Sequence, residues 1–140
     1  MTRKTEGMTH FLNVDLDLHS KFDLQPLVAA MGRKVLVLYV GRYKRTYQAH
    51  LELARSGLSE SADSTVRRFC ALIKALPGAA FAVWNAAKVR DFNIGVEAGT
   101  HPNSYEIALA PETVSAVSEV NARIVLTVVA SGFGENEPAA

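Results

Sequence analysis

The chain has little cysteine, which limits the cross-links and metal centres it can form. Cys70 is the only cysteine among 140 residues, so a disulfide within one chain is excluded and no thiolate cluster is available to a metal. It sits among the apolar residues Val66, Phe69 and Ile73. Because free cysteine is among the most buried residue types, we expect Cys70 to be a buried structural thiol.

Long apolar runs and an excess of charge of one sign are missing too. Apolar stretches such as 35–40 have the length of a strand and fall short of the ~20 residues of a membrane-spanning helix. The polar N-terminus leads into no apolar segment of signal-peptide type. A net charge of +1 gives no general attraction to nucleic acid or anionic lipid. We expect a cytoplasmic protein that binds neither membranes nor nucleic acid.

Motifs of known catalytic sites are also absent. The chain has no P-loop, no G-x-S-x-G, no Cys–His pairing and no zinc-ligand spacing. Gly95 and Gly99 do not complete a phosphate-binding loop, and Gly95 is expected to make room for an aromatic ring, that of Trp84 or Tyr105. We predict no metal and no cofactor, and we favour a binding role over an enzymatic one.

The residues that are present indicate an ordinary folded domain. Hydrophobic residues make up 49% and charged residues 21% of the chain, as in typical globular proteins. A length of 140 residues is enough for one hydrophobic core. The ends, residues 1–8 and 131–140, lack periodicity and are predicted to be disordered, which leaves a single domain over residues 9–130.

Strand and helix patterns alternate along this domain. The segment from Leu12 to His19 alternates apolar and polar residues without a break, which is typical of a strand with one face in the core. Pro26 and Pro111 each open a helix that follows such a strand. Predicted strands cover residues 11–19, 35–40, 46–54, 91–98, 105–109 and 124–129, and predicted helices cover 26–31, 62–76, 79–88 and 111–120.

This order of elements consists of three consecutive β-α-β units. It predicts an α+β fold, a two-layer sandwich in which helices cover one face of a mixed, mostly antiparallel sheet. We expect about six strands, arranged in the split β-α-β units of ferredoxin-like folds.

The end of the chain carries a resemblance to a known group of proteins. Residues Leu109–Val114 open a helix, and Ala122–Val128 follow it as an apolar strand. In this ending and in its order of elements, the chain resembles small uncharacterised bacterial domains, some of them found beside toxin and immunity genes. The resemblance rests on pattern, implies no catalytic residues and favours a binding role.

The outward side chains of the alternating strands form the first candidate site. If the strands at 11–19 and 46–54 are neighbours, carboxylates and imidazoles gather on one surface: Asp15, Asp17, His19, His50 and Glu52. Such groups bind divalent metals or exchange protons near neutral pH, but the same pattern is typical of a solvated sheet face. We expect the two strands to be close, and the charges to be solvated or paired with Arg or Lys.

A basic hairpin forms the second candidate site. Arg42, Lys44 and Arg45 follow the apolar strand, and Arg33 and Lys34 precede it. Three tyrosines are interleaved with these cations: Tyr39, Tyr43 and Tyr47. Cations and aromatic rings together bind phosphates and bases, and the cations suit an acidic protein equally well. Charges on a hairpin also protect a sheet edge against aggregation.

Two functions are compatible with these observations. The first is a non-enzymatic interaction domain that binds a protein partner through the polar sheet face or the basic hairpin. The alternative is a regulatory domain that senses a small molecule at a site between sheet and helices, by analogy with ferredoxin-like folds. We also expect a homodimer formed by edge pairing or face packing, because an open sheet has edges.

Overall fold

The computed structural model describes residues 7–54 and 60–131. The ends that were predicted to be disordered lie almost wholly outside the described residues. Gly7, Met8 and Ser131 are described, and Met8 forms an isolated bridge with His101.

The described chain forms five strands and four α-helices. In chain order these are β1 (His10–Ser20), α1 (Gln25–Met31), β2 (Val35–Tyr43), β3 (Thr46–Leu53), α2 (Ala62–Lys74), α3 (Gly78–Ala86), β4 (Val89–Glu97), α4 (Pro111–Glu119) and β5 (Arg123–Val129), with a short 3-10 turn, η1 (Gly32–Lys34), before β2.

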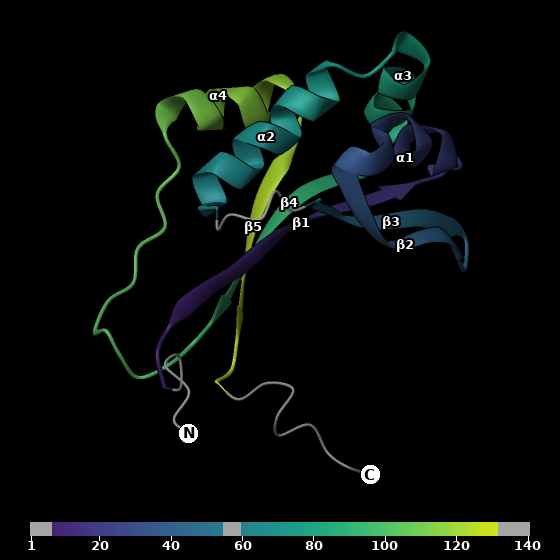
Figure 1. Cartoon of the computed structure of the whole chain (residues 1–140). Coiled ribbons are helices and arrows are strands. Elements are labelled where there is room, and N and C mark those ends of the chain that lie inside the picture. Colours follow the sequence, from purple (N-terminus) through teal and green to yellow (C-terminus); the bar gives the residue numbers. More distant parts are fainter. Residues whose placement is uncertain (1–6, 55–59, 132–140) are drawn as a thin grey trace.

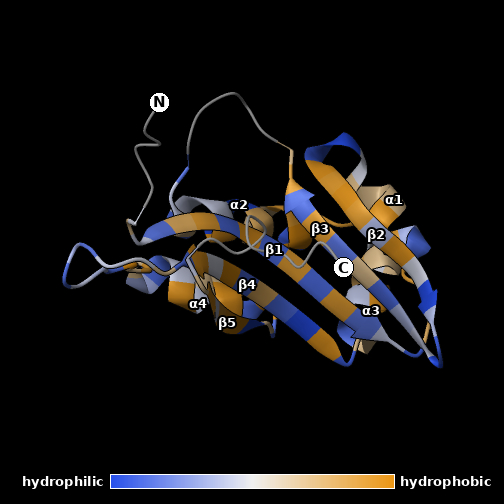
Figure 2. Cartoon of the chain, turned by 90° about the horizontal axis from the view of Figure 1, so that it is seen from below, coloured by the Kyte–Doolittle hydropathy of each residue, from blue (hydrophilic) through white to orange (hydrophobic). Residues whose placement is uncertain are grey.

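The strands form one open, mixed sheet in the order β2-β3-β1-β4-β5. Neighbouring strands are antiparallel except for β4 and β5, which are parallel. All four helices lie on one face of the sheet (Figure 1), so the predicted α+β class with helices on one face is confirmed. The opposite face is turned toward the viewer in Figure 2, where apolar and polar residues alternate along β1 and β3.

The predicted strand at 105–109 is wrong, and the described residues form five strands rather than six. Residues 104–110 run without regular pairing between β4 and α4. Because β4 already lies between β1 and β5, it offers this segment no free edge. The apolar residues Ile107 and Leu109 pack against the core from an irregular segment, and the hydroxyl of Tyr105 accepts a hydrogen bond from the backbone N–H of Phe11 at 2.8 Å.

The core lies between the sheet and the helices. Val14, Leu16 and Leu18 on β1 are almost completely buried, as their period of two predicts. The rings of Phe69 on α2 and Phe92 on β4 pack at a centroid distance of 5.6 Å. Cys70 is also buried, in agreement with the expected structural thiol.

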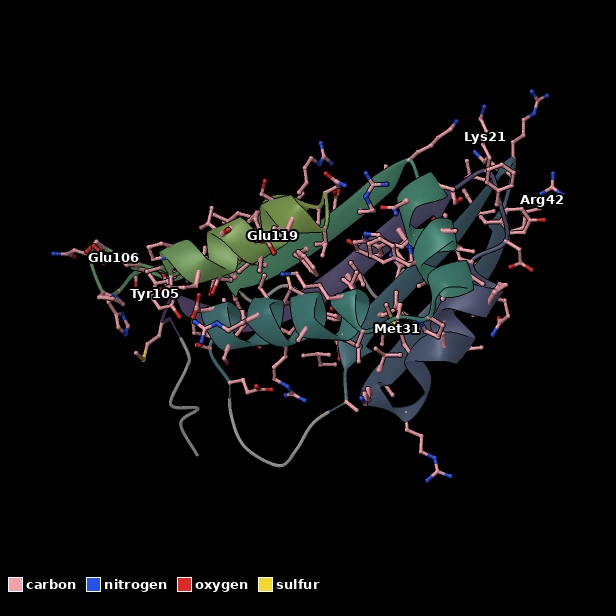
Figure 3. The ribbon with its side chains drawn as sticks, turned by 90° about the horizontal axis from the view of Figure 1, so that it is seen from above. Lys21, Met31, Arg42, Tyr105, Glu106 and Glu119 are labelled. Atoms are coloured by element: carbon pink, nitrogen blue, oxygen red, sulfur yellow. The ribbon has the colours of Figure 1, made fainter. Side chains whose placement is uncertain are left out.

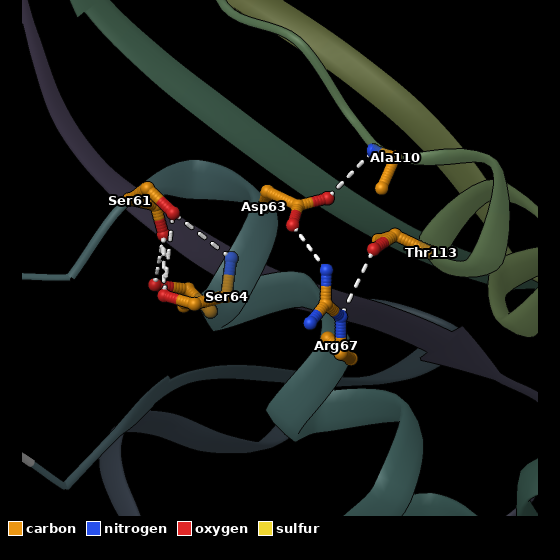
Figure 4. A network of polar contacts seen from close by, with 7 residues as sticks. Ser61, Asp63, Ser64, Arg67, Ala110 and Thr113 are labelled. Atoms are coloured by element: carbon orange, nitrogen blue, oxygen red, sulfur yellow. Dashed lines mark hydrogen bonds and ion pairs between the residues drawn. The ribbon is translucent and has the colours of Figure 1, made fainter.

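A polar network joins the N-termini of α2 and α4 (Figure 4). Ser61 caps α2 by accepting a hydrogen bond from a backbone N–H of the first turn. The carboxylate of Asp63 accepts a hydrogen bond from the backbone N–H of Ala110 at 2.8 Å, and Arg67 donates to the hydroxyl of the buried Thr113 at 3.2 Å. Hydrogen bonds from Thr113 and Ala110 lower the pKa of Asp63, so this network holds α4 against α2.

Gly95 does not make room for an aromatic ring, contrary to expectation. A Cβ atom placed on Gly95 would meet Asn13 at 3.4 Å and Leu12 at 3.8 Å. Trp84 lies under the helices instead, where its indole N–H donates to the carbonyl of Val120 at 2.8 Å. The register of β1 against β4 shifts beside Gly95, so this glycine accompanies an irregularity of the sheet.

Within the described residues, no single helix is long and apolar enough to span a membrane. Helices α2 and α3 together reach the required length and composition, with a bend of 120° between them.

Candidate binding surfaces on the open sheet face and the hairpin

The uncovered face of the sheet carries the polar side chains of the alternating strands. Strands β1 and β3 are antiparallel neighbours with Asp17 opposite His50, so the expected proximity of the two segments is confirmed. Asp15 and His19 lie on the same face of β1 as Asp17, and Glu52 lies on the same face of β3 as His50. The structure therefore brings all five predicted residues onto one surface.

Asp17 is held by partners on both sides. Its Oδ1 atom lies 2.8 Å from Nδ1 of His50, and its Oδ2 atom accepts a hydrogen bond from Asn93 of β4 at 3.4 Å. The side-chain oxygen of Asn93 in turn accepts from the hydroxyl of Thr127 on β5 at 2.7 Å. A chain of polar contacts thus crosses four strands.

Asp15 and Glu52 form a second group beside this chain. The amide of Asn13 donates to Oδ1 of Asp15 at 3.1 Å and also to Glu52. Burial of the carboxyl, together with the charge of Glu52, raises the pKa of Asp15 to about 6. Asp15 is therefore a carboxyl group that exchanges a proton near neutral pH.

Two aromatic rings lie near His50 on this face, one from each neighbouring strand. The rings of His19 and His50 lie edge to face, 6.3 Å apart, and the ring of Tyr39 on β2 lies 6.2 Å from that of His50. His50 is thus positioned by its carboxylate partner and by two rings.

Among the described residues, no Arg or Lys forms an ion pair with Asp15, Asp17 or Glu52 of this face, contrary to one of the two expected arrangements. Asp15, Asp17 and Glu52 are bound by Asn and His side chains. The guanidinium of Arg123 instead binds the buried Asp91, in two hydrogen bonds of 2.9 and 2.8 Å. The sequence had not singled out this pair. Among the residues that the structure describes, no three His, Cys, Asp or Glu side chains are grouped so that they could hold a metal ion.

The basic hairpin lies at one end of the sheet. Its two-residue loop, Lys44-Arg45, connects the paired residues Tyr43 and Thr46, and Lys44 adopts a left-handed backbone with a φ of 57°. The ammonium group of Lys44 lies 5.3 Å from the ring centre of Tyr43. The guanidinium of Arg42 lies 5.6 Å from the ring centre of Tyr47.

Two further lysines lie at this end, and the sequence had not connected them with the hairpin. Lys21 directly follows Ser20, which is paired with Tyr47, and Figure 3 shows Lys21 at the same end of the sheet as Arg42. Lys88 donates its backbone N–H to the carbonyl of His19 at 2.7 Å. The basic end, as we call it, therefore consists of five exposed cations: Lys21, Arg42, Lys44, Arg45 and Lys88.

None of the cations of the basic end forms an ion pair with an acidic residue in the described part of the chain.

Arg33 and Lys34, which the sequence placed with the hairpin, lie at the other end of β2. Val35 pairs with Leu53 there, and the carbonyl of Lys34 accepts from the N–H of Ala54 at 2.9 Å. The length of β2 thus separates two basic groups that are near in sequence.

A surface depression of about 460 Å³ lies between α2 and α4. Its walls carry the ion pair of Lys74 with Glu119, together with Pro111 and Ser115. This depression is bounded by helices and not by the sheet, so it differs from the sheet–helix site that the alternative function would use.

No family model, no curated protein and no solved structure matches this chain. The resemblance to small bacterial domains therefore stays a prediction.

Proposed function

We propose that this chain is a non-enzymatic interaction domain that binds an acidic protein partner through the basic end of its sheet. The observation that carries the proposal is the set of exposed cations at that end, which have no acidic partner among the described residues. Unpaired charges of one sign attract and orient a partner of opposite sign.

The polar sheet face is the weaker candidate for the contact surface. Asp15, Asp17 and Glu52 already accept hydrogen bonds from neighbouring side chains. A partner that binds there would have to replace these contacts, and each replacement lowers the net gain in affinity. The cations of the basic end have no carboxylate partner among the described residues that a new partner would have to replace, and Arg42 and Lys44 can keep their contacts with the rings of Tyr47 and Tyr43 on one side.

A protein partner is favoured over RNA by the surroundings of the tyrosines. Arg42 and Lys44 already cover one face of Tyr47 and Tyr43, so these rings offer less free surface for stacking on bases. The net charge of +1 also provides no overall attraction to a polyanion.

We further infer a ferredoxin-like plan for the first four strands. Its support is the order β2-β3-β1-β4, in which β1 lies between β3 and β4 and is antiparallel to both. The two strands of the unit β1-α1-β2 are thereby separated by β3, and those of the unit β3-α2-α3-β4 by β1. Strand β5 is an addition beside β4.

The proposal is tested with a labelled peptide rich in Asp and Glu, whose binding is followed by fluorescence anisotropy at low and physiological salt. The double variant Lys44→Gln/Arg45→Gln removes two cations of the basic end. Its matched control, Arg68→Gln/Lys74→Gln, removes one Lys and one Arg from α2, where both form exposed ion pairs.

We expect the hairpin variant to bind the acidic peptide about tenfold more weakly, since two exposed charge pairs contribute about 0.2–1 kcal/mol each and also direct the approach of the partner. The control should bind as the parent chain does, and binding should weaken as salt rises. Equal affinity of both variants, or preferential binding of single-stranded RNA over the acidic peptide, would show that the proposal is wrong.

A further inference from the structure

Strand β2 is an edge of the sheet with exposed apolar side chains. It ends the strand order, and within the described residues β3 is the strand that pairs with it. Leu36, Leu38 and Tyr43 each expose more than half of their surface. An edge strand of nine residues presents unpaired backbone groups that can bind a further strand.

The basic residues at the two ends of β2 indicate which kind of strand can pair with this edge. Both ends of β2 are basic, with Arg33 and Lys34 before it and Lys44 and Arg45 after it. If two copies of the chain paired their β2 strands antiparallel, the cations before β2 in one copy would lie beside the cations after β2 in the other. Like charges opposite one another destabilise a strand pair, so a second copy is a poor occupant.

The pairing of β2 with β3 indicates which part of β2 can best bind an added strand. The pairing of β2 with β3 shifts between Val37 and Tyr39, and such irregularities interrupt an edge. Residues 39–43 pair regularly with β3 up to the loop. This regular part adjoins Arg42, Lys44 and Arg45 of the basic end.

We propose that an extended segment of the acidic partner adds to the sheet as a further strand along residues 39–43 of β2. This inference rests on the proposed function and specifies how the partner is held. Backbone hydrogen bonds provide the alignment, apolar residues of the segment contact the exposed rings of Tyr39 and Tyr43, and its acidic residues contact the cations of the hairpin.

The backbone groups available to such a segment follow from the hairpin. Residues Tyr43 and Thr46, which flank a two-residue loop, exchange hydrogen bonds with each other. Successive residues of a strand point their backbone N–H and C=O groups to opposite edges of that strand. The N–H groups of Arg42 and Val40 therefore point away from β3. The carbonyl of Arg42 accepts a hydrogen bond from the hydroxyl of Tyr39 at 3.4 Å, a contact that an added strand would replace.

The test uses two synthetic peptides of the same composition on the full chain. The first has alternating Val and Thr in its centre and Asp-Glu at each end, and the second has the acidic residues in the centre and the Val and Thr residues at the ends. Affinity is measured by anisotropy, and amide hydrogen exchange is measured by NMR with and without peptide.

We expect the first peptide to bind about tenfold more tightly than the second, a difference that electrostatic attraction alone would not produce. On binding, the amides of Val40 and Arg42 should exchange several-fold more slowly, whereas those of Gly41 and Tyr43, already bonded to β3, should not change.

The possible failures are distinguishable from one another. Equal affinity for both peptides without new protection on β2 would overturn strand addition and leave the proposed function standing. Absence of binding to either peptide would overturn both. Protection of Val40 and Arg42 that rises with protein concentration in the absence of peptide would identify a second copy as the occupant, and strand addition by an acidic partner would then be wrong.

Discussion

Replacing Asp15 by Asn should stabilise the protein at neutral pH. Burial and the neighbouring Glu52 raise the pKa of Asp15 from 3.8 to about 6. A difference of about 2 pH units corresponds to about 3 kcal/mol at 1.36 kcal/mol per unit. Asp15 keeps partial contact with water, which screens the repulsion. We therefore expect Asp15→Asn to raise the free energy of unfolding by about 1–2 kcal/mol at pH 7.5.

The sign of the effect determines its pH dependence. Because the folded state raises the pKa of Asp15, the folded chain binds its proton more tightly than the unfolded chain does. Below the unfolded pKa of about 4, Asp15 is protonated in both states, so the parent chain does not carry the repulsion. As the pH rises through about 6, Asp15 ionises in the folded chain and the parent chain loses stability. The advantage of Asp15→Asn should be absent at pH 3.5 and complete at pH 7.5.

Urea unfolding at both pH values, followed by the fluorescence of Trp84, measures this difference. Glu106→Gln, which removes one negative charge from an exposed position, serves as the matched control and should change stability by less than about 0.5 kcal/mol. A loss of stability in Asp15→Asn at pH 7.5, or an equal gain at both pH values, would refute the argument from burial and repulsion.

Three further predictions concern two buried side chains of the core and the contact of Gly99 with the backbone of Gly7. Trp84→Phe should lower the free energy of unfolding in urea by about 1–3 kcal/mol, since it leaves the carbonyl of Val120 without its donor; a loss below about 0.5 kcal/mol would contradict this. Gly99→Ala should lower the stability of the fold by about 1–2 kcal/mol in thermal melts, because the added Cβ would lie 2.4 Å from the backbone oxygen of Gly7. The control Gly78→Ala, which has open space around it, should leave the stability unchanged. Cys70, whose pKa burial raises to about 11, should react with a thiol reagent at pH 8 only as fast as the chain unfolds, and rapid labelling of the native protein would be inconsistent with its burial.

Local patterns in the sequence predicted the elements whose faces differ in polarity. The alternation from Leu12 to His19 predicted β1 and its buried face, because side chains of a strand point alternately to its two sides. The spacing of Val66, Phe69 and Ile73 predicted α2 in the same way. The same pattern failed at Tyr105, since an apolar alternation becomes a strand only where another strand offers an edge.

The surfaces depended on contacts between distant parts of the chain. The sequence identified Asp17 and His50 as candidates, but it could not provide the register that places them opposite each other. It grouped Arg33 with Arg42 because they are close in the chain, although the length of β2 separates them. Lys88 joined the basic end through the pairing of distant strands.

The sequence by itself determined the α+β class, the buried face of each amphipathic element and the chemical types of the candidate groups. These follow from side-chain polarity and from the periods of helix and strand, which are local properties. Only the tertiary structure decided the strand order, the position of β2 at the edge of the sheet, the hydrogen bonds of the polar face and, among the described residues, the absence of acidic partners at the basic end. Each of these depends on which strands become neighbours, and that choice is made by burial of the whole core and not by any single segment.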